Sequence, residues 1–288
     1  MPNRVIYFDC ASGVSSDMLL GALIDVGADL NYIKGEVSKI ISEHIDITAD
    51  RIKKNSIEGV DLNVVLYDSP LHDHDYYDTG VHRERERSPI HDHDHDFILP
   101  GAGKHKHDTG KVGIHTSYHA IRHLIEGSGL SEGVKQRMLD IYSVIAEAEA
   151  GVHGTDKENV VFHEVGRIEQ IVTIAAICIA VETLSVTKIL TSAVHDGSGQ
   201  IESAHGFIPV PVPAVVEILK RSGIPIVIEA DVTTEMVTPS GLGILEGLGA
   251  RYEQRLAISP LRTGYGFGKR DTGRFGAVRV ILGEESNI

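Results

Sequence analysis

Residues 7–27 read YFDCASGVSSDMLLGALIDVG, and this stretch decides the class of fold. The apolar run at residues 5–8 predicts a buried strand that ends at Asp9. A loop of small residues follows, and helical spacing of apolar residues begins near Ser16 or Asp17. A strand, a short loop and a helix in this order are typical of the opening unit of an α/β fold.

The same alternation of short apolar runs and amphipathic segments continues along the chain. Ser131 is the expected N-cap of a long helix that Gly151 is expected to end. We therefore expect an α/β protein with a mainly parallel or mixed sheet, covered by helices, and a long His-rich loop. The other expected strands are 62–67, 160–162, 188–194, 224–230 and 277–282, and the expected helices are 118–125, 131–151, 168–184 and 213–222.

The chain divides by its patterning at residues 70 and 116. Residues 1–70 form an N-terminal α/β segment by their periodicity. After Pro70 the periodic apolar positions stop, so residues 71–116 are expected to be a flexible insert rich in His and Asp. Residues 117–288 are expected to form a second α/β segment, continuous with the first in one globular unit.

Composition excludes several classes of partner. The chain has 288 residues and a net charge of −14, which argues against binding to nucleic acid or to an anionic membrane surface. The N-terminus lacks the apolar core of a signal peptide, and the longest apolar stretch, 171–181, is too short to span a bilayer. Cys10 and Cys178 are the only cysteines, so a disulfide framework is not expected. We expect a cytoplasmic protein.

Histidine is concentrated in one part of the chain, where 11 of the 16 histidines fall between His72 and His123. Residues 72–75 read HDHD and residues 91–96 read HDHDHD. Alternating imidazole and carboxylate groups on a flexible chain suit nickel, zinc, copper or cobalt. The alternative is a solvated acidic loop that binds metal only adventitiously. The candidate metal ligands in this segment are His72, His74, His91, His93, His95, His105 and His107.

Other candidates lie at the ends of expected elements. His163 and Glu164 follow a short strand, and His153 lies at the end of the preceding helix, so they are candidate metal ligands or proton acceptors. Core or capping histidines are an equal alternative. His205 precedes the proline-spaced stretch 209–213, which is either a site wall or a connector. The loop after Asp9 leads into a helix N-terminus that could hold a phosphate, although ordinary helix capping explains it as well.

Several segments occur in a fixed order that resembles the LarC family, the nickel-insertion proteins of nickel-pincer cofactor synthesis. They are the opening stretch, the His-rich insert, LSEGVKQRMLDIYSVIAEAEAGVHG, FHEVGRIEQIV, GSGQIESAHGFIPVPVPA, EMVTPSGLGIL and GYGFGKRD. The resemblance covers nearly all of residues 4–284. It implies a nickel chelatase that delivers Ni²⁺ to pyridinium-3,5-bisthiocarboxylic acid mononucleotide, forming the cofactor of lactate racemase-type enzymes. It also implies consumption of CTP with Mn²⁺ or Mg²⁺.

The resemblance implies roles for individual residues. Weak imidazole sites in the insert suit delivery of nickel, and His153 and His163 are further expected ligands. Formation of a nickel–carbon bond removes a ring proton, so a base is needed, with His163 preferred over Glu164 and His205. The substrate phosphate and its surroundings are assigned to the first loop, at Asp9, Ser12, Gly13, Ser15, Ser16 and Asp17.

The chain departs from the family pattern at several positions. Val161 replaces a usual His, while Glu169 and Thr173 replace usual Asp residues, which weakens the expectation of catalysis more than that of fold. A nickel-storing or nickel-carrying protein without chelatase activity is therefore the alternative. The sequence ends soon after RVILGEE, whereas many members of the family continue into a C-terminal domain associated with nucleotide binding, so CTP use is expected either to require a separate C-terminal-domain polypeptide or to be absent. A recipient apo-racemase and a homo-oligomer are further expected partners. Ser16, His195 and Asp196 also differ from the pattern.

Overall fold

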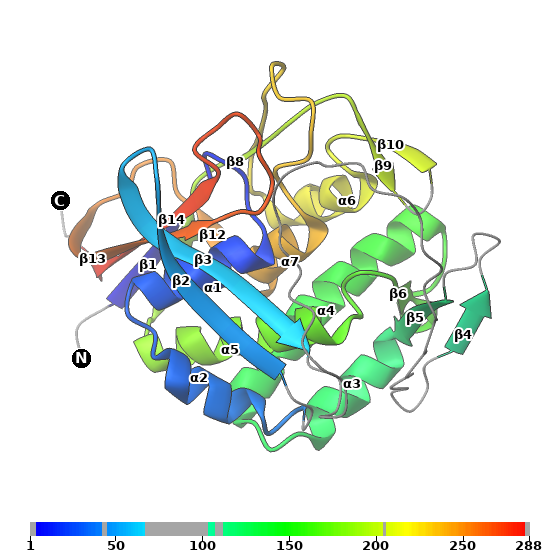
Figure 1. Ribbon diagram of the computed structural model, residues 1–288. Helices are drawn as coiled ribbons and strands as arrows, with labels where there is room; N and C mark the ends of the chain where they lie inside the picture. The colour runs from blue at the N-terminus through cyan, green and yellow to red at the C-terminus, as the bar shows by residue number, and fades with distance from the viewer. Residues whose placement is uncertain (1–3, 42–44, 67–102, 107–111, 204–205, 286–288) are drawn as a thin grey trace, which may run out of the picture.

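The computed structural model describes residues 4–41, 45–66, 103–106, 112–203 and 206–285 (Figure 1). The described strands are β1 (Arg4–Asp9), β2 (Ile45–Lys54), β3 (Ile57–Leu66), β4 (Gly103–Lys106), β5 (Val112–Ser117), β6 (Val161–Phe162), β7 (Lys188–Thr191), β8 (Val194–Asp196), β9 (Gln200–Ser203), β10 (Gly206–Pro209), β11 (Ile226–Ile228), β12 (Arg251–Tyr252), β13 (Ile258–Phe267) and β14 (Ala277–Glu285). The described helices are α1 (Ser16–Asp25), α2 (Leu30–Val37), α3 (Tyr118–Gly127), α4 (Glu132–His153), α5 (Ile168–Leu184), α6 (Pro213–Ser222) and α7 (Pro239–Gly247), with a 3₁₀ turn at Lys157–Asn159.

A mixed sheet forms the centre of the fold, in the strand order β12-β7-β1-β14-β13-β3-β2. β1 pairs in parallel with β7 and antiparallel with β14. β13 pairs antiparallel with β14 and in parallel with β3, and β3 pairs antiparallel with β2. The predicted fold class, an α/β protein with a mainly parallel or mixed sheet covered by helices, is confirmed, and the sheet is of the mixed kind.

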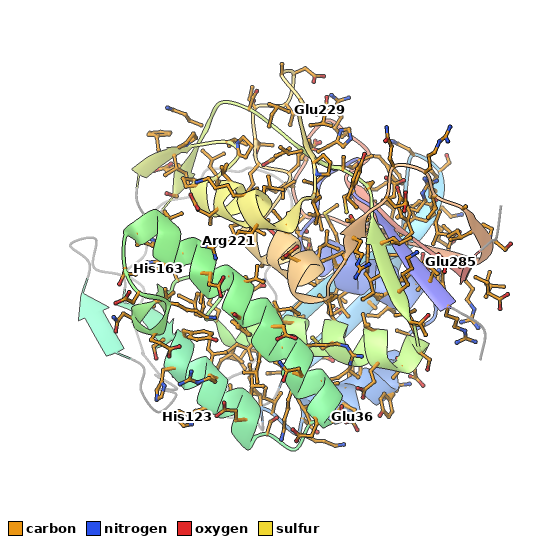
Figure 2. The ribbon with its side chains drawn as sticks, turned by 180° about the vertical axis from the view of Figure 1, so that it is seen from behind. Glu36, His123, His163, Arg221, Glu229 and Glu285 are labelled. Atoms are coloured by element: carbon orange, nitrogen blue, oxygen red, sulfur yellow. The ribbon has the colours of Figure 1, made fainter. Side chains whose placement is uncertain are left out.

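The helices are stacked in layers against this sheet. α1 contacts β3, β13 and β14 directly, and α5 packs between α1 and α4. Figure 1 shows the sheet in front of these helices, and Figure 2 shows α4 in front from the opposite side. Neighbouring elements cover α5 on all sides, and its residues are mostly apolar around the whole helix. A helix with this pattern is expected to be buried, so its burial was predictable from its sequence.

Some local predictions are wrong. Gly151 does not end α4, which continues to His153 and stops at Gly154, where the left-handed conformation (φ 63°) forms the C-cap. The expected strand 188–194 is two strands, because the chain leaves the central sheet after Thr191 and β8 then pairs with β11. β2 was not expected. Parts of the expected loop, β4 and β5, pair as antiparallel strands, while residues 67–102 and 107–111 lie outside the described residues.

α1 approaches the sheet closely because Gly266 has no side chain. A Cβ atom on Gly266 would overlap the Met18 carbonyl oxygen, a backbone atom that can move only with the helix. We expect Gly266→Ala to lower the free energy of unfolding by about 1–3 kcal/mol, as for other overpacked cores. Gly35→Ala, in α2 with nothing within 4 Å, is the matched control and should be neutral or raise stability by up to about 1 kcal/mol. Urea unfolding measures both, and equal effects would contradict this packing.

Candidate active site

The loop between β1 and α1 is fixed against a segment more than 200 residues later in the chain. Val14 N–H donates to the Met236 carbonyl oxygen at 2.9 Å, and Thr238 N–H donates to the Val14 carbonyl oxygen at 2.9 Å. Gly13 has φ +87°, and a Cβ there would overlap the Met236 oxygen, so this position requires glycine. These contacts place the start of α1 beside the start of α7.

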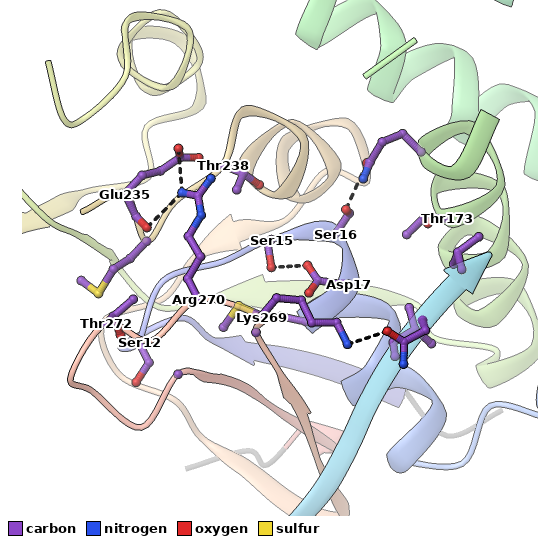
Figure 3. A pocket seen from close by; sticks show the side chains of 18 of the residues that line it. Ser12, Ser15, Ser16, Asp17, Thr173, Glu235, Thr238, Lys269, Arg270 and Thr272 are labelled. Carbon is purple, nitrogen blue, oxygen red and sulfur yellow. Dashed lines mark hydrogen bonds and ion pairs between the residues drawn. The ribbon is translucent and has the colours of Figure 1, made fainter. Parts of the chain in front are cut away.

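A cavity of about 370 Å³ opens beside this loop (Figure 3). We call it the serine cavity. The first loop and α1 form one wall, the beginning of α5 forms another, and the turn between β13 and β14 supplies two cationic side chains. Its polar lining includes Ser12, Ser15, Asp17, Thr173, Lys269 and Arg270. Lys269 Nζ lies 2.5 Å from Asp61 Oδ1 and 2.9 Å from Asn63 Oδ1 at the rim.

A second cavity, of about 350 Å³, lies between the end of α4, the segment after β6, and the hairpin of β9 and β10. We call it the histidine cavity, because His153 and His163 line it. The two cavities share a wall, so a molecule in one lies beside a molecule in the other. The side chains common to both linings belong to Ser15, Ser16, Asp17, Gln170, Glu235, Thr238 and Arg270.

Several helices begin at these cavities. Residues in the first turns of α1, α5, α6 and α7 line the histidine cavity. Residues of α1 and α5 and the N-cap of α7, Thr238, also line the serine cavity. The N-terminal N–H groups and dipoles of helices favour negative charge. Carboxylates of Asp17, Glu164 and Glu235 lie on the same walls. The combined site can therefore accept an anionic group and a cation close together.

Glu235 and Arg270 form an ion pair on the shared wall. Arg270 Nη1 lies 2.9 Å from Glu235 Oε2, and the Glu235 side chain is only 7% exposed whereas that of Arg270 is 53% exposed (Figure 3). Burial raises the pKa of Glu235, the hydrogen bond and charge of Arg270 oppose this, and the carboxylates of Asp196 and Glu164 add to the rise. Glu235 is thus a buried acid whose charged form depends on a half-exposed partner.

Asp196 fixes the backbone next to Glu235. It is completely buried, and its Oδ1 accepts hydrogen bonds from the N–H groups of Gly197 (2.8 Å), Met236 (2.7 Å) and Val237 (3.2 Å). Its Oδ2 has no hydrogen-bond partner among the described residues. Burial raises the pKa of Asp196, although these backbone hydrogen bonds oppose the rise. Asp196, which is one of the residues that differ from the family pattern, therefore holds the backbone of the segment that carries Glu235.

The residues expected to bind the nucleotide are mostly brought together. Ser12, Ser15, Ser16 and Asp17 line the serine cavity. Ser15, not Ser16, is the N-cap residue of α1; Ser15 Oγ donates to Asp17 Oδ1 at 2.5 Å, and Ser16 Oγ donates to Gln170 Oε1 at 3.1 Å. Gly13 shapes the loop without lining the cavity.

Asp9 lies apart from the serine cavity. It pairs with Arg279 at 2.5 Å and lines a smaller hollow with Tyr265 and Phe275, which adjoins the serine cavity only at Ser12. Cys10, the next residue, is buried, and burial raises its pKa to about 12, so its thiol does not offer a thiolate ligand near neutral pH.

His153, His163 and Glu164 all line the histidine cavity, and Figure 2 shows His163 beside one end of α4. His153 Nε2 lies 3.4 Å from Glu149 Oε2. His105 lies in β4. Among the residues that the structure describes, no three His, Cys, Asp or Glu side chains are grouped so as to hold a metal ion. The other predicted histidines, His72, His74, His91, His93, His95, His107 and His205, lie outside the described residues.

The positions that depart from the family pattern fall in different places. Glu169 and Thr173 line the serine cavity from one face of α5, whereas Val161 is 43% exposed and lines neither cavity. His195 Nδ1 lies 2.7 Å from Glu229 Oε1. Sequence reasoning missed Glu235 and Arg270, although both lie in segments that carry the family resemblance, EMVTPSGLGIL and GYGFGKRD.

A mixed α/β fold whose helices begin around paired polar cavities is typical of a protein that handles small charged ligands. The sequence matches the family described as nickel insertion protein over residues 6–288, and the chain belongs to that family. Among the described helices, none combines the length and the apolar character needed to cross a membrane.

Curated relatives carry consistent names. The "Pyridinium-3,5-bisthiocarboxylic acid mononucleotide nickel insertion protein" of Acetivibrio thermocellus is 40% identical over 97% of this chain and 60% of the relative. The protein of the same name from Lactiplantibacillus plantarum is 38% identical over 99% of this chain and 63% of the relative. A "Putative nickel insertion protein" of Dictyoglomus thermophilum is 34% identical over 98% of this chain and 61% of the relative. The chain thus spans about three fifths of the length of these relatives. No solved structure matches it.

The raised pKa of Asp196 gives a pH-dependent prediction. The native state holds the proton of Asp196 to a higher pH than the unfolded chain does, so the stability gained from this group is lost as pH rises from the ordinary value of 3.8 through the raised pKa. In the variant Asp196→Asn the side-chain amide does not titrate, and its oxygen can still accept the backbone N–H groups. The free energy of unfolding of this variant relative to the natural chain should therefore increase with pH across this window. Urea unfolding over a pH series measures it, and a constant or falling difference would refute the assignment.

Proposed function

We propose that this chain inserts Ni²⁺ into pyridinium-3,5-bisthiocarboxylic acid mononucleotide as a nickel chelatase of nickel-pincer cofactor synthesis. The observation that carries the proposal is the shared wall between the serine cavity and the histidine cavity. One cavity has helix N-termini and cationic side chains suited to an anionic nucleotide, and the other has imidazole and carboxylate groups suited to nickel. Family membership supports the same activity.

In this proposal the nucleotide phosphate binds at the N-terminus of α1. Ser12 supplies a hydroxyl donor and the start of α1 supplies backbone N–H donors, while the Ser15 and Ser16 hydroxyls donate to Asp17 and Gln170 and so fix the shape of the cavity wall. Gly13 permits the loop conformation, and Asp9 supports its start through Arg279. A phosphate at this point leaves the pyridinium ring free to lie along the shared wall.

Nickel enters from the histidine side. His153 and His163 are the proposed ligands in the cavity, and the His-rich insert supplies further imidazoles for collection: His72, His74, His91, His93, His95, His105 and His107. When nickel replaces the ring proton, the electron pair of the C–H bond becomes the carbon–nickel bond, and the proton passes to a base with no change of oxidation state. His163 is the first choice for that base, and it must release nickel before it accepts the proton; Glu164 and His205 are the other candidates.

The resemblance to the LarC family also implies further partners. We propose that CTP, with Mn²⁺ or Mg²⁺, is used together with a C-terminal-domain polypeptide. The product would pass to an apo-racemase. We infer a cytoplasmic setting, self-association into a homo-oligomer, and no nucleic-acid or membrane partner, in keeping with the net charge of −14.

A nickel carrier without chelatase activity is the second candidate. The observation that favours it is the position of Thr173, which lines the serine cavity where the family pattern has a carboxylate. Loss of that carboxylate removes a candidate cation ligand while leaving the histidine side intact.

Nickel transfer to the bisthiocarboxylate mononucleotide, followed by the change in absorbance, tests the proposed activity. We expect His163→Ala to lower the rate at least about 10²-fold, the usual cost of removing a catalytic acid–base group. His123→Ala, a 65% exposed side chain on α3, is the matched control and should retain full activity. Reactions with and without CTP, Mn²⁺ and an added C-terminal domain show which additions are needed. Full activity of His163→Ala would rule out His163 as the base.

Deletion of residues 72–107 separates the two candidates. An insertase should lose most of its weakly bound nickel yet keep a site near His163 and His205, because both residues lie outside the deleted segment. A carrier should lose nearly all stoichiometric nickel. Equilibrium dialysis of both chains against Ni²⁺ measures the difference.

A further inference from the structure

We propose that the Glu235–Arg270 ion pair couples the two cavities, so that an anionic ligand in the serine cavity opens a binding position for a divalent cation in the histidine cavity. The inference deepens and rests on the proposed function, because it states how nucleotide and nickel are brought together. It concerns binding alone and applies before any bond to carbon is formed.

The two partners differ in freedom to move. Glu235 is held by a backbone that Asp196 fixes through the N–H groups of Met236 and Val237, and its side chain is 7% exposed. Arg270 is 53% exposed, on the glycine-containing turn 268–276 between β13 and β14. Its Nη1 lies 2.9 Å from the Glu235 carboxylate, and the same nitrogen makes a longer contact, at 3.4 Å, with the Glu235 carbonyl oxygen. The guanidinium can therefore exchange partners while the backbone of Glu235 stays in place.

An anionic group in the serine cavity competes for that guanidinium. Arg270 lines this cavity together with Lys269 and the N-terminus of α1. The planar fork of arginine binds phosphate and carboxylate groups in a bidentate manner, which the present contact with the Glu235 carboxylate through Nη1 does not use. A nucleotide that binds here thus gains Arg270 at the expense of Glu235.

Loss of Arg270 leaves a buried carboxylate without its counter-charge. Such a group either takes up a proton or attracts another cation, because an isolated buried charge is costly. Glu235 also lines the histidine cavity, where Glu164 and His163 are neighbours. No three metal ligands are already grouped among the described residues, so Glu235 completes a cation position only when its carboxylate turns from Arg270 toward Glu164 and His163.

The coupling is reciprocal by thermodynamic linkage, so the anion and the cation must strengthen each other's binding by the same factor. This behaviour suits an insertase. Nickel would be held loosely until the nucleotide has bound, and it would then be held beside the molecule that receives it.

Calorimetric titration of the full chain with NiCl₂, with and without saturating nicotinate mononucleotide, tests this inference. That probe carries a pyridinium ring, a carboxylate and a phosphate but has no thiocarboxylates, so it does not form the cofactor. We expect it to tighten nickel binding at least about fivefold. In Glu235→Gln the effect should vanish, and the probe alone should bind more tightly than to the natural chain because Arg270 no longer has a competing carboxylate.

Two further variants complete the test. Arg270→Gln, at an exposed position that tolerates substitution, should bind nickel more tightly without the probe and should not respond to it. Arg274→Gln is the matched control: it breaks two other ion pairs of the same turn, to Glu229 at 3.0 Å and to Asp231 at 2.7 Å. These residues line neither cavity, so the variant should keep the coupling. No coupling in the natural chain, or full coupling in both Glu235→Gln and Arg270→Gln, overturns the inference. Coupling without nickel insertion would instead count against the proposed function alone.

Discussion

The site depends on a short backbone bridge between the first loop and the segment before α7. Val14 exchanges hydrogen bonds with Met236 and Thr238, and Gly13 leaves room for the Met236 carbonyl. The bridge brings the beginnings of α1 and α7 together, and Ser16 joins α5 through Gln170. Without these contacts the helix N-termini would not face a common space, and neither cavity would have its shared wall.

Two acidic side chains, Asp196 and Glu235, are buried near this bridge, and hydrogen bonds reduce the free-energy cost of burying them. Asp196 is fully buried, but the N–H groups of Gly197, Met236 and Val237 satisfy one of its oxygens. Glu235 is nearly buried and relies on Arg270. This chain therefore keeps two acids with raised pKa values close together. Such perturbed groups at a cavity are typical of functional sites.

The sequence was most informative where one physical pattern dominates. The predominantly apolar character of 168–184 predicted α5 with its bounds, and the small residues after β1 predicted the turn into α1. His163 and Glu164, which line the histidine cavity, were singled out because they directly follow a strand. Glu235 and Arg270 were missed because their importance comes from a contact between segments that no local pattern connects. Gly151 was mistaken for a helix end because glycine is compatible with a helix interior, and the left-handed residue that ends α4 is Gly154.

The central claim is that nucleotide and nickel occupy adjoining cavities on either side of one wall. A crystal structure of the chain with nicotinate mononucleotide and Ni²⁺ tests it most directly. The account predicts phosphate density at the N-terminus of α1 near Ser12 and Ser15, the pyridinium ring along the wall of Glu235, and nickel on the side of His163. A phosphate bound outside the serine cavity, or nickel remote from His163, would contradict it.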